Sequence, residues 1–265
     1  MQIQTLREKA RELWVRCGKC GLVMEKSKYE TNAGVCSRCG HHHRLSAEQR
    51  AAQLFDPGSF QLLGKEMRTE DPLNFQDGSY YQAALELDKE AMVYGTGAIA
   101  GMPCVAALMD FSVFGGSMGT AVGEIFRRAC ALCVEDRRAL IAVTSSGGVR
   151  MQEGTPALLQ MAKVMIALEE LAGARLPCIS LLCDPTCGGV AASFATAADV
   201  ILAEPGALIC FSGPRVSEQT IGISHATDFS RAESLYERGL VDMVVPRARQ
   251  REVLAGLLAF FRERR

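Results

Sequence analysis

The sequence lacks long apolar runs and is poor in histidine. No stretch of about 18 uncharged apolar residues occurs, so no membrane-spanning helix is predicted. The first residues, MQIQTLREKARELW, lack the continuous apolar segment of a secretory signal. Of the four histidines three are consecutive, which leaves a single histidine elsewhere in the chain for acid–base chemistry. These absences predict a cytoplasmic protein with no membrane partner.

An excess of charge of one sign is also missing from the chain as a whole. The net charge of −1 argues against binding nucleic acid over the entire surface. Residues 1–50 differ, because they carry ten Lys and Arg against five Asp and Glu. This basic region is either a solvated face or a contact surface for nucleic acid or an acidic partner subunit. The composition, 48% hydrophobic and 22% charged, is typical of a globular protein.

Cysteine is abundant, and four cysteines form the clearest motif of the chain. A C-x2-C pair is followed by a second pair after an x15 spacer, which is typical of a zinc site. Four thiolates complete a tetrahedron at about 2.3 Å per Zn–S bond and leave no position for substrate. We therefore predict a structural zinc ion. Its ligands are Cys17, Cys20, Cys36 and Cys39.

Most other cysteines lie in apolar runs, which favours a reduced protein over a disulfide scaffold. Cys130 and Cys133 form a further C-x2-C, but no second pair accompanies them. Their surroundings, EIFRRACALCVED, are typical of a helix. Buried thiols are therefore favoured there over a redox pair.

The zinc motif belongs to a small N-terminal domain. We predict this domain over residues 1–45, beginning with a short amphipathic helix over 1–13. The main domain is predicted over 46–265. It opens with a capping box of Ser46 and Gln49, which begins a helix.

The main domain has the pattern of an α/β fold. After an irregular polar stretch, 64–92, two apolar strands are predicted to form a hairpin that turns at residues 101–103. Buried strands then alternate with helices, which implies parallel pairing in a sheet covered on both faces. The strands are expected over 139–146, 176–184, 199–205 and 207–213, and the helices over 126–136, 156–172, 189–198 and 248–264.

Two of these strands end in a pair of glycines just before a helix. Gly147-Gly148 follows ALIAVTSS, and Gly188-Gly189 follows PCISLLCDPTC. Glycine lets the backbone approach a ligand closely, and two facing N–H groups form an oxyanion hole for a carbonyl that gains charge. The alternative is a pair of ordinary strand–helix turns that use glycine for their geometry.

A serine hydrolase is a second hypothesis. Residues 115–119, GGSMG, match the G-x-S-x-G motif between a strand and a helix, with Ser117 as nucleophile. Asp184 or Asp199, followed by His225, would complete the order of a catalytic triad. Such short motifs often match by chance.

Six segments of the chain carry linked motifs in order. They are CSRCGHHHRLSAEQR, FSVFGGSMGTAVGE, TSSGGVRMQEG, DPTCGGVAASFA, AEPGALICFSGPRVSEQT and GLVDMVV. With the zinc array they resemble the β-subunit family of bacterial acetyl-CoA carboxylase carboxyltransferase, from about Trp14 to Val245. This resemblance implies a crotonase-like fold (ClpP/crotonase superfamily) of ββα units with an N-terminal zinc ribbon.

The resemblance also implies a reaction and partners. Enzymes of this family transfer CO₂ from carboxybiotin, held on a biotin carboxyl carrier protein, to acetyl-CoA and form malonyl-CoA. Biotin carboxylase loads the carrier, and a carboxyltransferase α subunit completes an α2β2 assembly. A decarboxylase of malonyl-type thioesters, and a nucleic-acid-binding zinc module, remain as alternatives.

The resemblance assigns roles to particular residues. The turns at Gly147, Gly148, Gly188 and Gly189 match the regions that hold the thioester oxygen. Residues expected near CoA are Gly115, Gly116, Ser117 and Arg150. The chain departs from the family at Cys187, where a methionine is common, and over residues 222–230.

Overall fold

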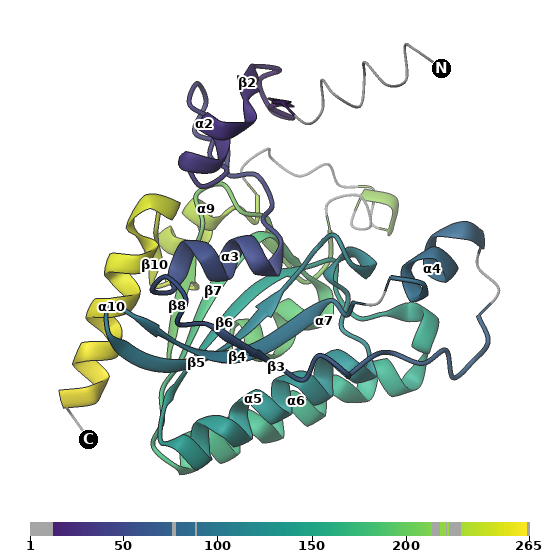
Figure 1. The fold of residues 1–265 in the computed structure, drawn as a ribbon. Helices are drawn as coiled ribbons and strands as arrows, with labels where there is room; N and C mark the ends of the chain where they lie inside the picture. Colours follow the sequence, from purple (N-terminus) through teal and green to yellow (C-terminus); the bar gives the residue numbers. More distant parts are fainter. Residues whose placement is uncertain are drawn as a thin grey trace.

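A computed structural model describes residues 13–75, 78–87, 89–213, 218–220, 222 and 229–263. The predicted helix over 1–13 lies outside these ranges except for its last residue. The chain forms a small N-terminal ribbon and a larger α/β domain (Figure 1). The boundary between residues 45 and 46 remains our proposal.

The ribbon is built from short elements. Strands β1 (Trp14–Arg16) and β2 (Val23–Glu25) pair antiparallel, and helix α2 (Lys26–Thr31) follows. The next helix, α3 (Ala47–Leu54), begins at the predicted capping box: the Gln49 amide donates to Ser46 Oγ, and the Ser46 amide donates to Gln49 Oε1. The capping prediction is confirmed.

Within the described residues, eight strands form the main sheet in the order β10-β8-β7-β6-β5-β4-β3, with β9 paired to the end of β7. Pairing is antiparallel from β3 to β5 and parallel from β5 to β10, as the strand–helix alternation predicts. The strands are β3 (Gln61–Leu63), β4 (Met92–Ile99), β5 (Met102–Met109), β6 (Ala139–Ser146), β7 (Cys178–Cys187), β8 (Val200–Ala203), β9 (Ile209–Cys210) and β10 (Met243–Val244).

The helices lie on both faces of the sheet (Figure 1). Helices α3 and α10 pack on one face and α5 and α6 on the other. The helical segments of the main domain are α3, α4 (Gly78–Leu85), η1 (Phe114–Gly116), α5 (Thr120–Asp136), η2 (Met151–Glu153), α6 (Thr155–Gly173), α7 (Gly188–Val190), the π-helical turn η3 (Ala191–Ala195), α9 (Ala232–Glu237) and α10 (Arg247–Glu263).

The strands are apolar throughout because both faces are buried. In β5, Cys104, Ala106 and Leu108 face the α3–α10 side. Val105 and Ala107 face the α5–α6 side. Alternate residues of one strand therefore enter two separate cores.

Three predictions need correction. The stretch 64–92, predicted to be irregular, contains helix α4. The hairpin turns at Ala100 and Gly101, earlier than predicted, because Ile99 already pairs with Met102. Both turn residues have positive φ, as a tight hairpin requires, and both amides donate to the Asp56 carboxylate. The helix predicted over 189–198 is shorter and ends in the turn η3.

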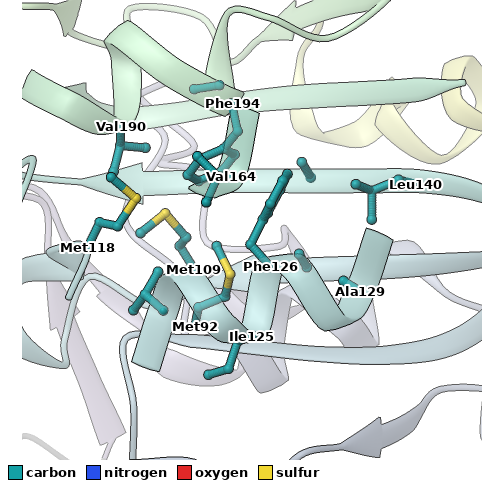
Figure 2. Close-up of a cluster of buried hydrophobic side chains, with 14 of the residues drawn as sticks. Met92, Met109, Met118, Ile125, Phe126, Ala129, Leu140, Val164, Val190 and Phe194 are labelled. Atoms are coloured by element: carbon teal, nitrogen blue, oxygen red, sulfur yellow. The ribbon is translucent and has the colours of Figure 1, made fainter. Parts of the chain in front are cut away.

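The core beneath α5 and α6 reaches the predicted site. Figure 2 shows Phe126 of α5 beside Phe194 of η3, and their ring centroids are 4.3 Å apart. Met118 and Val190 extend the same core. Val190 directly follows Gly189, so the packing of Val190 in this core fixes the position of the second glycine turn.

Candidate functional site

Two strand ends and the loop after β5 meet at one edge of the sheet. The Gly147 amide donates to the Gly115 carbonyl at 2.9 Å, and the Met118 amide donates to the Gly148 carbonyl at 2.8 Å. The Gly148 amide donates to Ser146 Oγ at 3.0 Å. These bonds fix the first glycine turn against residues 114–118.

The second turn touches the first through backbone atoms. The Gly188 amide donates to the Phe211 carbonyl at 3.1 Å. A methyl group on Gly188, where φ is +58°, would lie 2.9 Å from Gly148 Cα. A methyl group on Gly189 would overlap Val149 Cγ2 and lie 2.9 Å from Met161 Sδ. The two turns fit together because these positions have no side chain.

The glycine motif predicts that the amides of the glycine pairs are free to bind an oxyanion, but most of these amides are already bonded. Gly147, Gly148 and Gly188 each donate to an acceptor of the chain. In the described residues, no acceptor bonds the amides of Val149 and Gly189. Gly189 lies in the first turn of α7, where an amide has no intrahelical partner. The site therefore offers two backbone donors, one from each turn.

Arg150, predicted to lie near CoA, is buried between two carboxylates. The residue is 1% exposed, and its guanidinium pairs with Glu90 at 2.6 Å and Glu153 at 3.0 Å. It also donates to the Ser117 carbonyl and lies 4.0 Å from the centroid of the Phe114 ring. A guanidinium so enclosed holds the turn after Val149, and the place of Arg150 near CoA stays a prediction.

The sequence analysis missed the partners of Arg150. Glu90 and Glu153 are both buried, and the Glu153 carboxylate also accepts the amide of Thr120, the first residue of α5. Thr69 donates to Glu153 and accepts from Arg150. Glu153 belongs to the motif TSSGGVRMQEG, so the sequence could have marked it as a residue near the first glycine turn. Glu90 and Thr69 lie in the stretch 64–92, where no motif marks them.

The structure does not assemble a serine hydrolase site from the described residues. Ser117 Oγ accepts a hydrogen bond from Arg150 Nε at 3.1 Å, and a guanidinium cannot take the serine proton. Asp184 bonds the Leu208 amide and pairs with Arg231, while Asp199 accepts the Cys178 amide. His225 lies outside the described residues.

A cavity of about 800 Å³ opens between α3, β3 and the start of β4. Apolar side chains such as Phe55 and Leu62 line it, together with Lys65 and Lys89. Glu90 also lines it, so the cavity shares a wall with the carboxylates that hold Arg150. Its charged side chains are of both signs, because Glu48, Asp56, Glu90 and Asp110 line it together with Lys65, Arg68 and Lys89.

The four predicted metal ligands converge in the ribbon. Their sulfur atoms all lie within 4.8 Å of one another, and the distances Cys17–Cys39 and Cys20–Cys36 are both 3.7 Å. A tetrahedron with bonds of about 2.3 Å has edges of about 3.8 Å, so the donor set and its spacing fit Zn²⁺. None of the four is in a disulfide.

The other cysteine prediction, for the C-x2-C in α5, is also confirmed. Cys130 and Cys133 are buried in the core beneath α5. Burial raises the pKa of Cys130 to about 12 and raises the pKa of Cys133 still further. Both thiols are therefore protonated and inert at neutral pH.

Comparison with known proteins assigns the chain to a family. The family model for the carboxyl transferase domain matches residues 41–254. An acetyl-coenzyme A carboxylase carboxyl transferase subunit beta of Thermus thermophilus is 47% identical over 253 residues, covering 93% of this chain and 88% of the relative. The chain belongs to the carboxyl transferase family.

Two further relatives of this carboxyl transferase are informative. A protein of Salinispora tropica named as subunits beta/alpha is 46% identical over 254 residues, which are 94% of this chain and 45% of the relative. A Pseudomonas malonate decarboxylase hetero-tetramer, solved with malonate, has a TM-score of 0.68 at 25% identity over 83% of this chain and 82% of its own. The predicted crotonase-like α/β fold is confirmed.

The fold also bears on the predicted surroundings of the protein. No helix in the described part of this carboxyl transferase is long and apolar enough to cross a bilayer. In the basic ribbon, Lys26 and Lys28 pair with Glu30 and Glu25. The contact with nucleic acid stays a prediction.

Proposed function

We propose that this chain is the β subunit of an acetyl-CoA carboxylase carboxyltransferase, which transfers CO₂ from carboxybiotin to acetyl-CoA and forms malonyl-CoA. One observation carries the proposal: the two glycine turns touch and present the amides of Val149 and Gly189 without acceptors from the described chain. The carboxyltransferase name of relatives such as that of T. thermophilus supports the same reaction.

The two amides suit the step in which charge develops. Removal of a methyl proton from acetyl-CoA turns the thioester oxygen into an enolate oxygen, and two N–H donors stabilise that charge. Carboxybiotin, brought by a biotin carboxyl carrier protein after loading by biotin carboxylase, supplies CO₂ and the base. The chain then needs no catalytic histidine or carboxylate of its own. The enolate carbon bonds to CO₂ while the turns keep the oxygen in place.

The α subunit is the partner we propose, in an α2β2 assembly. In the S. tropica relative, beta and alpha parts are named on one chain, of which this chain matches less than half. A second protein of similar fold would supply the surface for biotin. Without it, the β chain has the acyl site alone.

Co-expression with an α subunit tests the proposal. We expect the purified complex to form malonyl-CoA from carboxybiotin and acetyl-CoA, and the β chain alone to form little. The same assay with propionyl-CoA in place of acetyl-CoA measures which acyl group the complex prefers. Inactivity with every α subunit, together with esterase activity that Ser117→Ala abolishes, would establish the hydrolase instead. Biotin-independent release of CO₂ from a malonyl thioester would establish a decarboxylase.

For the metal we propose Zn²⁺, bound as a structural ion. Replacing Cys36 by serine removes one thiolate from the cluster, so we expect loss of the bound zinc and of the ribbon's protection from hydrogen exchange. Zinc content measured by mass spectrometry after dialysis is the readout. Cys133→Ala, which removes a thiol outside the cluster, serves as the matched control. A Cys36→Ser protein that keeps its zinc and full activity contradicts the proposal.

A further inference from the structure

Two cysteines lie side by side next to the second glycine turn. Cys187 is the last residue of β7 and Cys210 the last residue of β9, and they are partners in the parallel register of these strands. Their sulfur atoms are 3.3 Å apart. Paired residues on neighbouring strands lie about 5 Å apart, within the Cα separation that a disulfide spans.

The two thiols have opposite tendencies to ionise. The hydrogen bond from the Cys187 thiol lowers the pKa of Cys210, and the charge of Arg231 lowers it further against the effect of burial. The same hydrogen bond and burial raise the pKa of Cys187. Cys187 is partly exposed, whereas Cys130, Cys133 and Cys178 are enclosed in the core. Cys210 itself is buried, so the thiol with the lowered pKa lies directly behind the one that solvent reaches.

We propose that Cys187 and Cys210 form an oxidisable dithiol, which peroxide converts into a disulfide that slows carboxyl transfer. The Cys210 thiolate attacks one oxygen of hydrogen peroxide, the O–O bond breaks, and a sulfenic acid and hydroxide are formed; the hydroxide takes up the proton that Cys210 had released and becomes water. The Cys187 thiol, on losing its proton, attacks the Cys210 sulfur and breaks the S–O bond, releasing a second water. Two thiols and one peroxide thus give one disulfide and two waters.

The disulfide acts on the site through Gly188. Bond formation shortens the sulfur separation from 3.3 Å to about 2.05 Å, at the residue before the turn. Gly188 has little room to adjust, because its amide is bonded to the Phe211 carbonyl and its Cα packs against Gly148. The strands already stand at a separation that a disulfide spans, so the change falls on Cys187 itself and passes through Gly188 to the Gly189 amide. The inference of slowed transfer rests on the proposed function, whereas disulfide formation does not.

The test uses the full chain assembled with its α subunit. After treatment with hydrogen peroxide, we expect a mass loss of two hydrogens per β chain and a cross-linked peptide containing Cys187 and Cys210. Activity should fall on the order of tenfold and return with dithiothreitol, since a shift of about 1 Å in a reacting group has effects of this size or larger. Zinc release, followed with a chromogenic chelator, reports damage to the ribbon separately.

Matched variants separate the outcomes. Cys187→Met should keep basal activity and lose the response to peroxide, while Cys133→Ala should keep both. Absence of the cross-linked peptide, while the ribbon still holds zinc, overturns the dithiol. Complete formation of the disulfide with an unchanged kcat overturns the proposed effect of the disulfide on the second glycine turn. An inactive complex that still forms the peptide contradicts the proposed function and leaves the dithiol supported.

Discussion

Gly189→Ala is expected to lower kcat for malonyl-CoA formation by about a hundredfold to a thousandfold, the usual cost of losing an oxyanion-hole donor. A methyl group at this position would overlap Val149 Cγ2 and press on Met161 Sδ. We expect the two turns to separate to relieve that overlap, which would shift the amides of both Val149 and Gly189. The donors act on charge that develops in the transition state, so KM for acetyl-CoA should change far less.

Gly101→Ala is the matched control for this prediction. Gly101 has φ of +77° at the tip of the β4–β5 hairpin, and a methyl group there meets nothing within 4 Å. The control carries backbone strain but lies outside both turns, so kcat should stay near that of the unaltered protein. Steady-state kinetics of the complex with the α subunit give kcat for each variant, and Tm shows whether the variant is folded. A Gly189→Ala complex with normal kcat would exclude the two amides from catalysis.

Local patterns in the sequence were sufficient for much of this architecture. The strands β6 and β7 are apolar runs that end in glycine pairs, so strand and turn could be predicted for both, and the long helix α6 after the first pair as well. The four cysteines of the ribbon were equally clear, because their spacing alone predicted that the two pairs would converge. These features depend on residues close together in the chain.

The chemistry at the turns depended on contacts that the sequence does not reveal. The resemblance places Arg150 near CoA, but the sequence does not reveal that Glu90, sixty residues earlier, pairs with its buried guanidinium. Likewise, the Gly147 amide is occupied because the loop after β5 brings the Gly115 carbonyl to it. Cys210 became the partner of Cys187 through the register of a two-residue strand.

A buried cluster of charges gives the second large prediction. Glu204, at the end of β8, pairs with Arg50 of α3 at 2.9 Å and with Arg247 of α10 at 2.7 Å, and all three are buried. Arg247 also donates to the carbonyls of Ala33 and His43 in the ribbon. One carboxylate therefore bridges the two arginines that join α3, α10 and the ribbon.

Glu204→Gln should lower the free energy of unfolding by about 3–5 kcal/mol, because it leaves two buried guanidinium groups without a counter-charge. Glu252→Gln is the control, since Glu252 pairs with Arg249 on a face where its side chain is 73% exposed, and it should cost about 0–1 kcal/mol. Urea unfolding measures both, and hydrogen exchange at residues 33–43 reports release of the ribbon. Equal, small losses in the two variants would contradict the prediction.

The same cluster sets a dependence on pH with a definite sign. Burial raises the pKa of Glu204, but Arg50 and Arg247 outweigh it and lower the pKa from 4.5 to about 2. A lowered pKa in the folded state means that the carboxylate stabilises the protein fully above pH 4.5. That contribution disappears as the pH falls from 4.5 towards about 2. The free energy of unfolding of the unaltered protein, measured by urea unfolding, should therefore fall as the pH is lowered across this range. The free energy of unfolding of Glu204→Gln should depend less on pH, because this variant has no carboxylate to protonate at position 204.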